Sequence, residues 1–240
     1  MLKPALYPAL LAACALVTTA GTASARAGSK GPVVVELFTS QGCSACIPAN
    51  ALLAELADRK DVLALTFPVD YWDYLGWRDT FAKQQFSDRQ RAYQKALGLR
   101  DVYTPQLVVD GAAQTGKTTS AGKAPAMIRA AAKAHRPAPA MHISQGRLTI
   151  GPGRWPAGGA EVWLVRYEGQ PQETAVKDGE NRGVNVVYRN VARELIRLGG
   201  WAGKSRTYDL PAPSGEDADL KSAVLLQAKA SGRILGALKR

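Results

Sequence analysis

The chain has 240 residues and a formal net charge of +11 at pH 7, from 31 lysines and arginines against 20 aspartates and glutamates. This excess is spread along the sequence without a lysine- or arginine-rich run. Because nucleic-acid binding requires a concentrated basic patch, the pattern argues against a nucleic-acid partner.

The N-terminal segment has the features of an export signal. Lys3 supplies a positive charge, residues 5–20 are apolar and uncharged, and small residues at 23–27 offer a cleavage site. We therefore predict a removable signal peptide over residues 1–27. The mature chain is then expected in the periplasm or outside the cell, with no stable membrane span. A retained membrane anchor and lipidation at Cys14 are the alternatives.

Two cysteines follow, at what the sequence predicts to be a strand-to-helix junction. Cys43 and Cys46 lie between an apolar, β-branched run, Val33 to Phe38, and an alanine- and leucine-rich stretch, Ala49 to Ala57. This arrangement is typical of reversible dithiol–disulfide chemistry. A thiol at a helix N-terminus meets free N–H groups and the positive end of the helix dipole, which favours its thiolate.

Residues 28–136 alternate predicted strands and helices. Strands are expected at 33–38, 62–69 and 103–111, with 112–115 pairing back after an Asp-Gly turn signal. Helices are expected at 44–59, at 77–97 with a capped break at Ser87, and at 124–135. The order β-α-β-α-β-β-α predicts an α/β sheet with helices on its faces.

Residues 137–240, after a proline-rich linker signal, are predicted to form a β-rich, sandwich-like second domain. Its strands are expected at 141–145, 147–150, 161–167, 173–177, 184–191, 206–210 and 223–228. From Ala192 onward the apolar residues also fit a helical stripe, so a helix there is the alternative. Without a catalytic motif of its own, this domain is expected to bind or dock.

Further residues are candidates for the site. Glu36, on the first strand, is either a buried proton acceptor for Cys46 or a surface residue at a strand edge. Tyr71 and Trp72 belong to an aromatic cluster that forms either a substrate platform or ordinary loop packing.

No cofactor or metal is expected. A closed zinc site needs four ligands, and besides the cysteine pair the chain offers His135 and His142 as its two histidines. Cu(I) held by the two thiols with Met141 or His142 is an alternative, because soft ligands suit that ion.

The element order, with a Cys-x-x-Cys opening the first helix and a Thr-Pro opening the third strand, resembles the thioredoxin-like fold over residues 31–135. The resemblance implies that Pro105 is cis and lies against the dithiol. It also implies that the backbone before the proline pairs with a bound substrate strand, which assigns Thr104 and Pro105 to substrate binding. An ordinary trans proline is the alternative.

Longer blocks resemble one exported bacterial family, called domain of unknown function 1223, in which a thioredoxin-like domain precedes a β-rich one. The blocks are Glu36–Cys46, Val69–Trp77 and Arg91–Gly111, with similar segments at 161–167, 179–181 and 190–199. This resemblance implies a fold and an exported location, and no assigned reaction.

Together these features predict an exported thiol–disulfide oxidoreductase, in which Cys43 attacks and Cys46 resolves the mixed disulfide. Its expected partners are protein thiols or disulfides of the cell envelope and a redox partner protein. The alternative is a non-catalytic thioredoxin-like binding module, handling Cu(I) or keeping a passive disulfide.

Overall fold

The first part of the chain folds in the predicted order. The computed structural model describes residues 31–115, 120–134, 137–213 and 219–240; the predicted signal peptide, Cys14 and His135 lie outside these ranges. The first elements are β1 (Val33–Thr39), η1 (Ser44–Cys46), α1 (Ile47–Ala57), β2 (Val62–Pro68), η2 (Asp73–Leu75), α2 (Gln84–Ala96), β3 (Gln106–Val109), β4 (Ala113–Gln114) and α3 (Ser120–Ala134). Apart from the two short 3₁₀ turns, this is the expected β-α-β-α-β-β-α sequence.

The second part is β-rich, as predicted. Its strands are β5 (Met141–Ser144), β6 (Arg147–Ile150), β7 (Ala160–Glu168), β8 (Gln172–Ala175), β9 (Asn185–Tyr188), β10 (Val191–Trp201), β11 (Arg206–Asp209), β12 (Lys221–Ala228) and β13 (Ile234–Lys239). None of the helices in the described ranges has both the length and the apolar character that a membrane span requires.

One mixed sheet runs through both parts. Its eight strands lie in the order β13-β12-β7-β10-β2-β1-β3-β4, and β1 pairs parallel with β2 and antiparallel with β3. The junction is at Val191 of β10, which pairs with Thr66 of β2. The side-chain amide of Asn190 also donates to the carbonyl of Ala64 at 2.8 Å. The predicted domains 28–136 and 137–240 therefore share a sheet, and the boundary between them stays a prediction.

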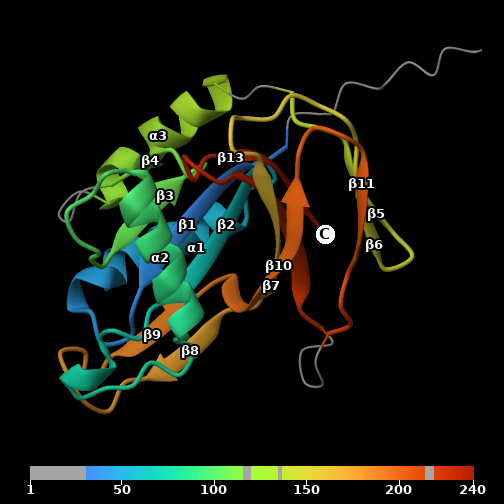
Figure 1. Ribbon diagram of the computed structural model, residues 1–240. Coiled ribbons are helices and arrows are strands. Elements are labelled where there is room, and N and C mark those ends of the chain that lie inside the picture. The colour runs from blue at the N-terminus through green and yellow to red at the C-terminus, as the bar shows by residue number, and fades with distance from the viewer. Residues whose placement is uncertain (1–30, 116–119, 135–136, 214–218) are drawn as a thin grey trace, which may run out of the picture.

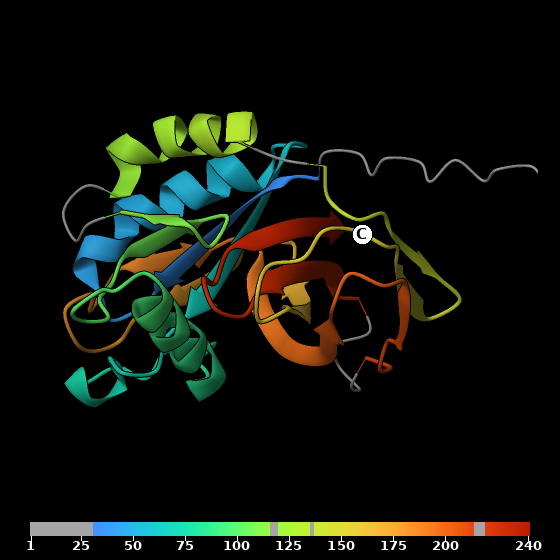
Figure 2. The same cartoon turned by 45° about the horizontal axis from the view of Figure 1, so that its top comes forward.

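Helices cover both faces of the first part of this sheet. On one face, α1 and α3 contribute Leu53 and Ile128 to a core that includes Leu37 of β1. On the other face, α2 packs Phe86 against Phe67 of β2, with ring centroids 5.3 Å apart. Figures 1 and 2 show the sheet between these helices. Successive strand side chains point to opposite faces. Because both faces are covered, every residue of β1 is buried, and Glu36 is the charged residue in its otherwise largely apolar run.

In the second part, a small sheet packs against strands of the main sheet. Four strands of the second part extend the main sheet, and a three-stranded sheet, β11-β6-β5, packs Leu148 and Ile150 into a core with Val162 and Val224 of the main sheet. Strands β8 and β9 form a separate two-stranded hairpin. The class is therefore α/β with a mixed main sheet and two small additional sheets.

Local expectations fail at three places. The helix predicted at 77–97 begins at Gln84 and has no break at Ser87, because the Ser87 hydroxyl donates to Asp70 at 2.5 Å instead of capping a helix. The alternative helix after Ala192 is wrong: this segment is β10, held between β7 and β2. Strand β13 was not predicted.

The predicted Asp-Gly turn is present and also connects distant segments. Asp110 and Gly111 have φ values of 48° and 60°, as a tight hairpin turn requires. A Cβ on Gly111 would lie 2.0 Å from the carbonyl oxygen of Gly232. Glycine therefore permits the close approach of the turn before β13 to the β3–β4 hairpin.

Candidate functional site

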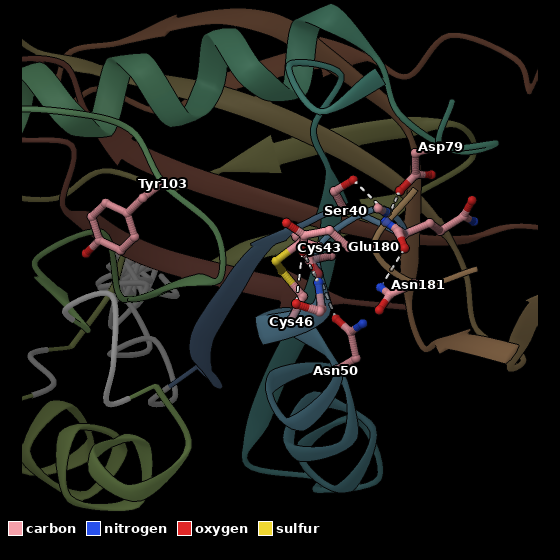
Figure 3. Close-up of a disulfide and its surroundings, with 12 residues drawn as sticks. Ser40, Cys43, Cys46, Asn50, Asp79, Tyr103, Glu180 and Asn181 are labelled. Carbon is pink, nitrogen blue, oxygen red and sulfur yellow. Dashed lines mark hydrogen bonds between the residues drawn. A yellow bond between two sulfur atoms is a disulfide. The ribbon is translucent and has the colours of Figure 1, made fainter. Parts of the chain in front are cut away.

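The cysteine pair forms a disulfide at the junction of β1 and the first helix. Cys43 and Cys46 are bonded to each other, with their Cα atoms 5.4 Å apart. Both are buried, with 1% and 0% of their surfaces exposed, while Ser44 and Ala45 between them are exposed. Figure 3 shows the pair and its surroundings.

The backbone places this pair at the start of a helix. The amide of Cys46 donates to the carbonyl of Cys43 at 3.1 Å, which closes the 3₁₀ turn that leads into α1. Pro48 occupies an early position of α1, and the side chains of Cys43 and Cys46, which precede the 3₁₀ turn and α1, make no capping hydrogen bond. A proline costs little there, since its missing N–H has no helical partner. The disulfide thus lies at the positive end of the helix dipole.

Gln41 anchors the loop that leads into the disulfide. Its amide donates to Asp79 at 2.8 Å, and its side-chain carbonyl accepts from the indole of Trp77 at 2.9 Å. Its own carbonyl accepts from the buried side chain of Asn181 at 2.8 Å. Segments 38 and 140 residues away therefore hold the same loop residue. Local sequence patterns did not identify these contacts.

Asp79 is a buried carboxyl without a cationic partner in the described contacts. Besides Gln41, it accepts from the hydroxyl of Tyr188 at 2.8 Å and from the amide of Phe81 at 2.9 Å. Burial raises the pKa of Asp79, and these hydrogen bonds oppose the rise.

Glu180 contacts Ser44, the first of the two residues between the cysteines. One of its carboxylate oxygens accepts from the amide of Ser44 at 3.2 Å and from the Ser44 hydroxyl at 2.9 Å. Glu180 lies in the connection between β8 and β9, and Figure 3 shows it beside Cys43. The block 179–181 resembled the family at the sequence level, but nothing in it indicated contact with the dithiol.

Thr104 and Pro105 lie at the end of β1 where the dithiol loop begins. Their peptide bond is cis, as the resemblance implied. Gln106 pairs with Phe38 in the antiparallel β1–β3 ladder, so the two residues before Gln106 come opposite the residues that follow Phe38.

The two predicted aromatic residues are half-buried and pack against the core on the α2 side of the sheet. The hydroxyl of Tyr71 lies beside Gln90 and Thr104, and burial raises its pKa. Trp72 lies against the dithiol loop, since its ring is 3.9 Å from the position that a Cβ on Gly42 would occupy. Both therefore border the site.

Glu36 is fully buried, which excludes the surface alternative. Its carboxylate forms an ion pair with Arg89, with 2.5 Å between Nε and Oε1, and accepts from the hydroxyl of Tyr93. Both partners lie on α2, which covers the face of the sheet opposite α1. The structure gives Glu36 partners other than the cysteines, and its role as a proton acceptor stays a prediction.

The proposed copper ligands do not come together. Met141 and His142 lie on β5, at the far end of the molecule from α1 in both views (Figures 1 and 2). Among the described residues, no group of three or more histidine, cysteine or acidic side chains is arranged to hold a metal ion.

Comparison with known proteins gives a family and two similar structures. Residues 34–227 match the family described as "Protein of unknown function (DUF1223)". The crystal structure of protein AGR_C_4864 from Agrobacterium tumefaciens is 31% identical, covers 88% of this chain and 94% of its own, and superposes with a TM-score of 0.67. HBP35 of Porphyromonas gingivalis is 15% identical, with coverage of 89% and 76% and a TM-score of 0.57, which is a likeness of fold alone. Among curated proteins, none matches.

Proposed function

This chain belongs to the DUF1223 family, whose function is unknown, and we propose that it is a thioredoxin-like thiol–disulfide oxidoreductase acting on proteins of the cell envelope. The observation that carries the proposal is the disulfide between Cys43 and Cys46 at the start of α1. A site of this kind lowers the cost of forming a thiolate, which is the species that attacks disulfides.

A structural role explains this disulfide poorly. A disulfide stabilises a fold mainly by closing a long loop in the unfolded chain, and this one encloses two residues. The same turn is already closed by the hydrogen bond from the Cys46 amide to the Cys43 carbonyl. The bond therefore adds little constraint, which favours a chemical purpose.

The proposed reaction is a two-step exchange. In the reduced protein, the Cys43 thiolate attacks one sulfur of a substrate disulfide; a protein–substrate S–S bond forms and the substrate's own S–S bond breaks. Cys46 then loses its proton and attacks Cys43, forming the protein disulfide and releasing the second substrate thiol. Two electrons and the two protons of the dithiol pass to the substrate. The reverse sequence oxidises a substrate dithiol.

We assign the substrate-binding role to residues that border the pair. An extended substrate segment would pair with the backbone before Pro105, beside the end of β1. Tyr71 and Trp72 would contact its side chains, since both border the same loop. The acceptor role predicted for Glu36 is left out of the proposed exchange, because its partners Arg89 and Tyr93 lie on α2. The envelope location rests on the signal peptide predicted over residues 1–27.

Trapping of the mixed disulfide tests the proposal. A Cys46→Ser protein expressed in cells should accumulate Cys43-linked mixed disulfides with envelope proteins, because the resolving thiol is missing. The Cys43→Ser/Cys46→Ser protein is the control and should trap none. The proposal fails if Cys46→Ser traps nothing and the purified wild-type protein neither reduces nor oxidises a peptide disulfide or dithiol.

A second function is favoured by one observation. Cys43 exposes 1% of its surface, so a substrate sulfur reaches it only after the surrounding segments move. A non-catalytic binding module with a passive disulfide needs no such movement. In that case the disulfide of the native protein should resist reduction by dithiothreitol until the protein unfolds.

A further inference from the structure

We propose that Glu180 is a positioning residue for the dithiol: its carboxylate holds Ser44 and opposes the build-up of negative charge on the sulfur of Cys43. This inference rests on the proposed function and adds a regulator to the same site. In this proposal the second half of the chain, which carries Glu180, helps to set the reduction potential of the disulfide.

The contact is with the segment that separates the cysteines. A single oxygen of Glu180 accepts from both the amide and the hydroxyl of Ser44, at 3.2 and 2.9 Å. Ser44 directly follows Cys43 and opens the 3₁₀ turn. The carboxylate therefore occupies an N–H group at the start of the helix, one residue from the proposed nucleophile.

The connection that carries Glu180 is fixed on both sides. Before it, Gly179 has a φ of 74° and a Cβ there would lie 3.3 Å from the carbonyl oxygen of Leu75. After it, Asn181 is buried and donates to the carbonyl of Gln41 at 2.8 Å. Glu180 is exposed, but its neighbours along the chain direct it towards the dithiol.

The contact affects the thiolate of Cys43 in two ways, and both disfavour it. The start of a helix favours an adjacent thiolate through its free N–H groups and its dipole, and Glu180 takes one of these N–H groups. Its negative charge also repels a thiolate nearby. Both effects disfavour the thiolate of Cys43. Since a reduced form that is less stable makes the disulfide a weaker oxidant, Glu180 shifts the pair towards the reducing side.

Other charged groups surround the loop without making this contact. The β8–β9 connection also carries Asp178 and Arg182, and the segment before α2 carries Asp73, Arg78 and Asp79. In the segment before Pro105, Arg100 and Asp101 pair with each other at 3.8 Å. Among the described residues, Glu180 is the charged side chain that hydrogen-bonds Ser44, the residue that follows Cys43.

The variant Glu180→Gln tests the charge alone, because glutamine keeps an oxygen acceptor for Ser44. The reduced protein is alkylated at a series of pH values and the rate at Cys43 is followed by peptide mass spectrometry. We expect the pH midpoint of reactivity to fall by about half a unit to one unit, as for a nearby, partly exposed charge. Against glutathione, the equilibrium should shift about three- to tenfold towards the reduced protein. At 29.6 mV per tenfold, the reduction potential rises by about 15–30 mV.

Glu173→Gln is the matched control. Glu173 lies in the same hairpin, on β8, and its exposed carboxylate accepts from Asn185 at 2.7 Å. The control should leave the pH midpoint of Cys43 alkylation unchanged.

High salt separates an effect of charge from an effect of conformation. The difference in alkylation midpoint between wild type and Glu180→Gln should shrink at about 1 M salt, where exposed charges are screened over about 3 Å. A conformational effect would persist.

Each outcome separates the two proposals. An unchanged midpoint in Glu180→Gln, an equal shift in Glu173→Gln, or a shift that salt does not reduce overturns the role of Glu180. Alkylation needs reduced thiols and no substrate. If wild type exchanges no disulfide but the midpoints differ as expected, the proposed function fails while the contact between Glu180 and the dithiol is upheld.

Discussion

Two carboxylates, one predicted from the sequence and one found beside the dithiol, lie in opposite environments. Glu36 is buried between the main sheet and α2, where Arg89 and Tyr93 surround it. Glu180 is exposed at the start of the CxxC turn, where it holds Ser44. Glu36 is close to the cysteines along the chain, whereas Glu180 is 136 residues from Ser44.

The contrast shows how environment divides the roles of similar groups. A buried carboxylate paired with a buried guanidinium is a fixed part of the core, and its removal leaves an uncompensated charge. An exposed carboxylate contributes little to stability, but its charge is free to act on a titrating neighbour. We therefore expect substitutions at Glu36 or Arg89 to change stability and substitutions at Glu180 to change thiol chemistry.

The largest effect is expected at the buried pair. Arg89→Met leaves Glu36 buried without a cation and should lower the free energy of unfolding by about 3–5 kcal/mol, measured by urea denaturation. The control Arg91→Met removes an exposed pair with Asp88 and should cost at most about 1 kcal/mol. If Arg89→Met does not fold, Glu36→Met/Arg89→Met should restore folding, because it removes both charges. A loss of less than about 1 kcal/mol in the free energy of unfolding of Arg89→Met would contradict the conclusion that Glu36 and Arg89 form a buried ion pair in the core.

Asp79 is an intermediate case, buried like Glu36 but held by neutral donors. Because its pKa in the folded protein is raised, its stabilising contribution is complete below the ordinary carboxyl value near 4 and is lost as pH rises through the raised value. The free energy of unfolding of wild type, measured relative to Asp79→Asn, should therefore fall as pH rises above about 4. A difference that is flat, or that grows with pH, contradicts the raised pKa.

The smallest effect is expected for Glu36→Gln on the thiols. A proton acceptor contributes about 100-fold or more to a rate. If Glu36 had this role, Glu36→Gln would slow the resolution of the mixed disulfide by about 100-fold or more. Since its partners lie on α2, we expect the resolution rate to change by less than about twofold and the alkylation midpoint of Cys43 to stay constant. Stopped-flow reaction with a peptide disulfide measures the rate. A loss of about 100-fold in the resolution rate would establish Glu36 as the proton acceptor and would contradict the purely structural role given to it here.

Where structure follows from neighbouring residues, the sequence predicted it well. The apolar run of β1, the Asp-Gly turn and the Cys-x-x-Cys pair are local patterns, and each appears in the structure where it was expected. The break predicted at Ser87 is absent from α2, and the Ser87 hydroxyl bonds to Asp70, 17 residues away, rather than capping a helix. The segment after Ala192 fitted two periodicities, and its pairing with β7 decided between them.

The sequence by itself determined the dithiol, its place between a strand and a helix, and the family. The tertiary structure decided what surrounds the dithiol. Gln41, Asn181 and Glu180 meet only after β10 joins β2 in the main sheet and carries the β8–β9 hairpin to the loop. Contacts over such separations arise from packing and leave no periodic signature along the chain. The alternation of side chains on β1 likewise turned Glu36 towards α2.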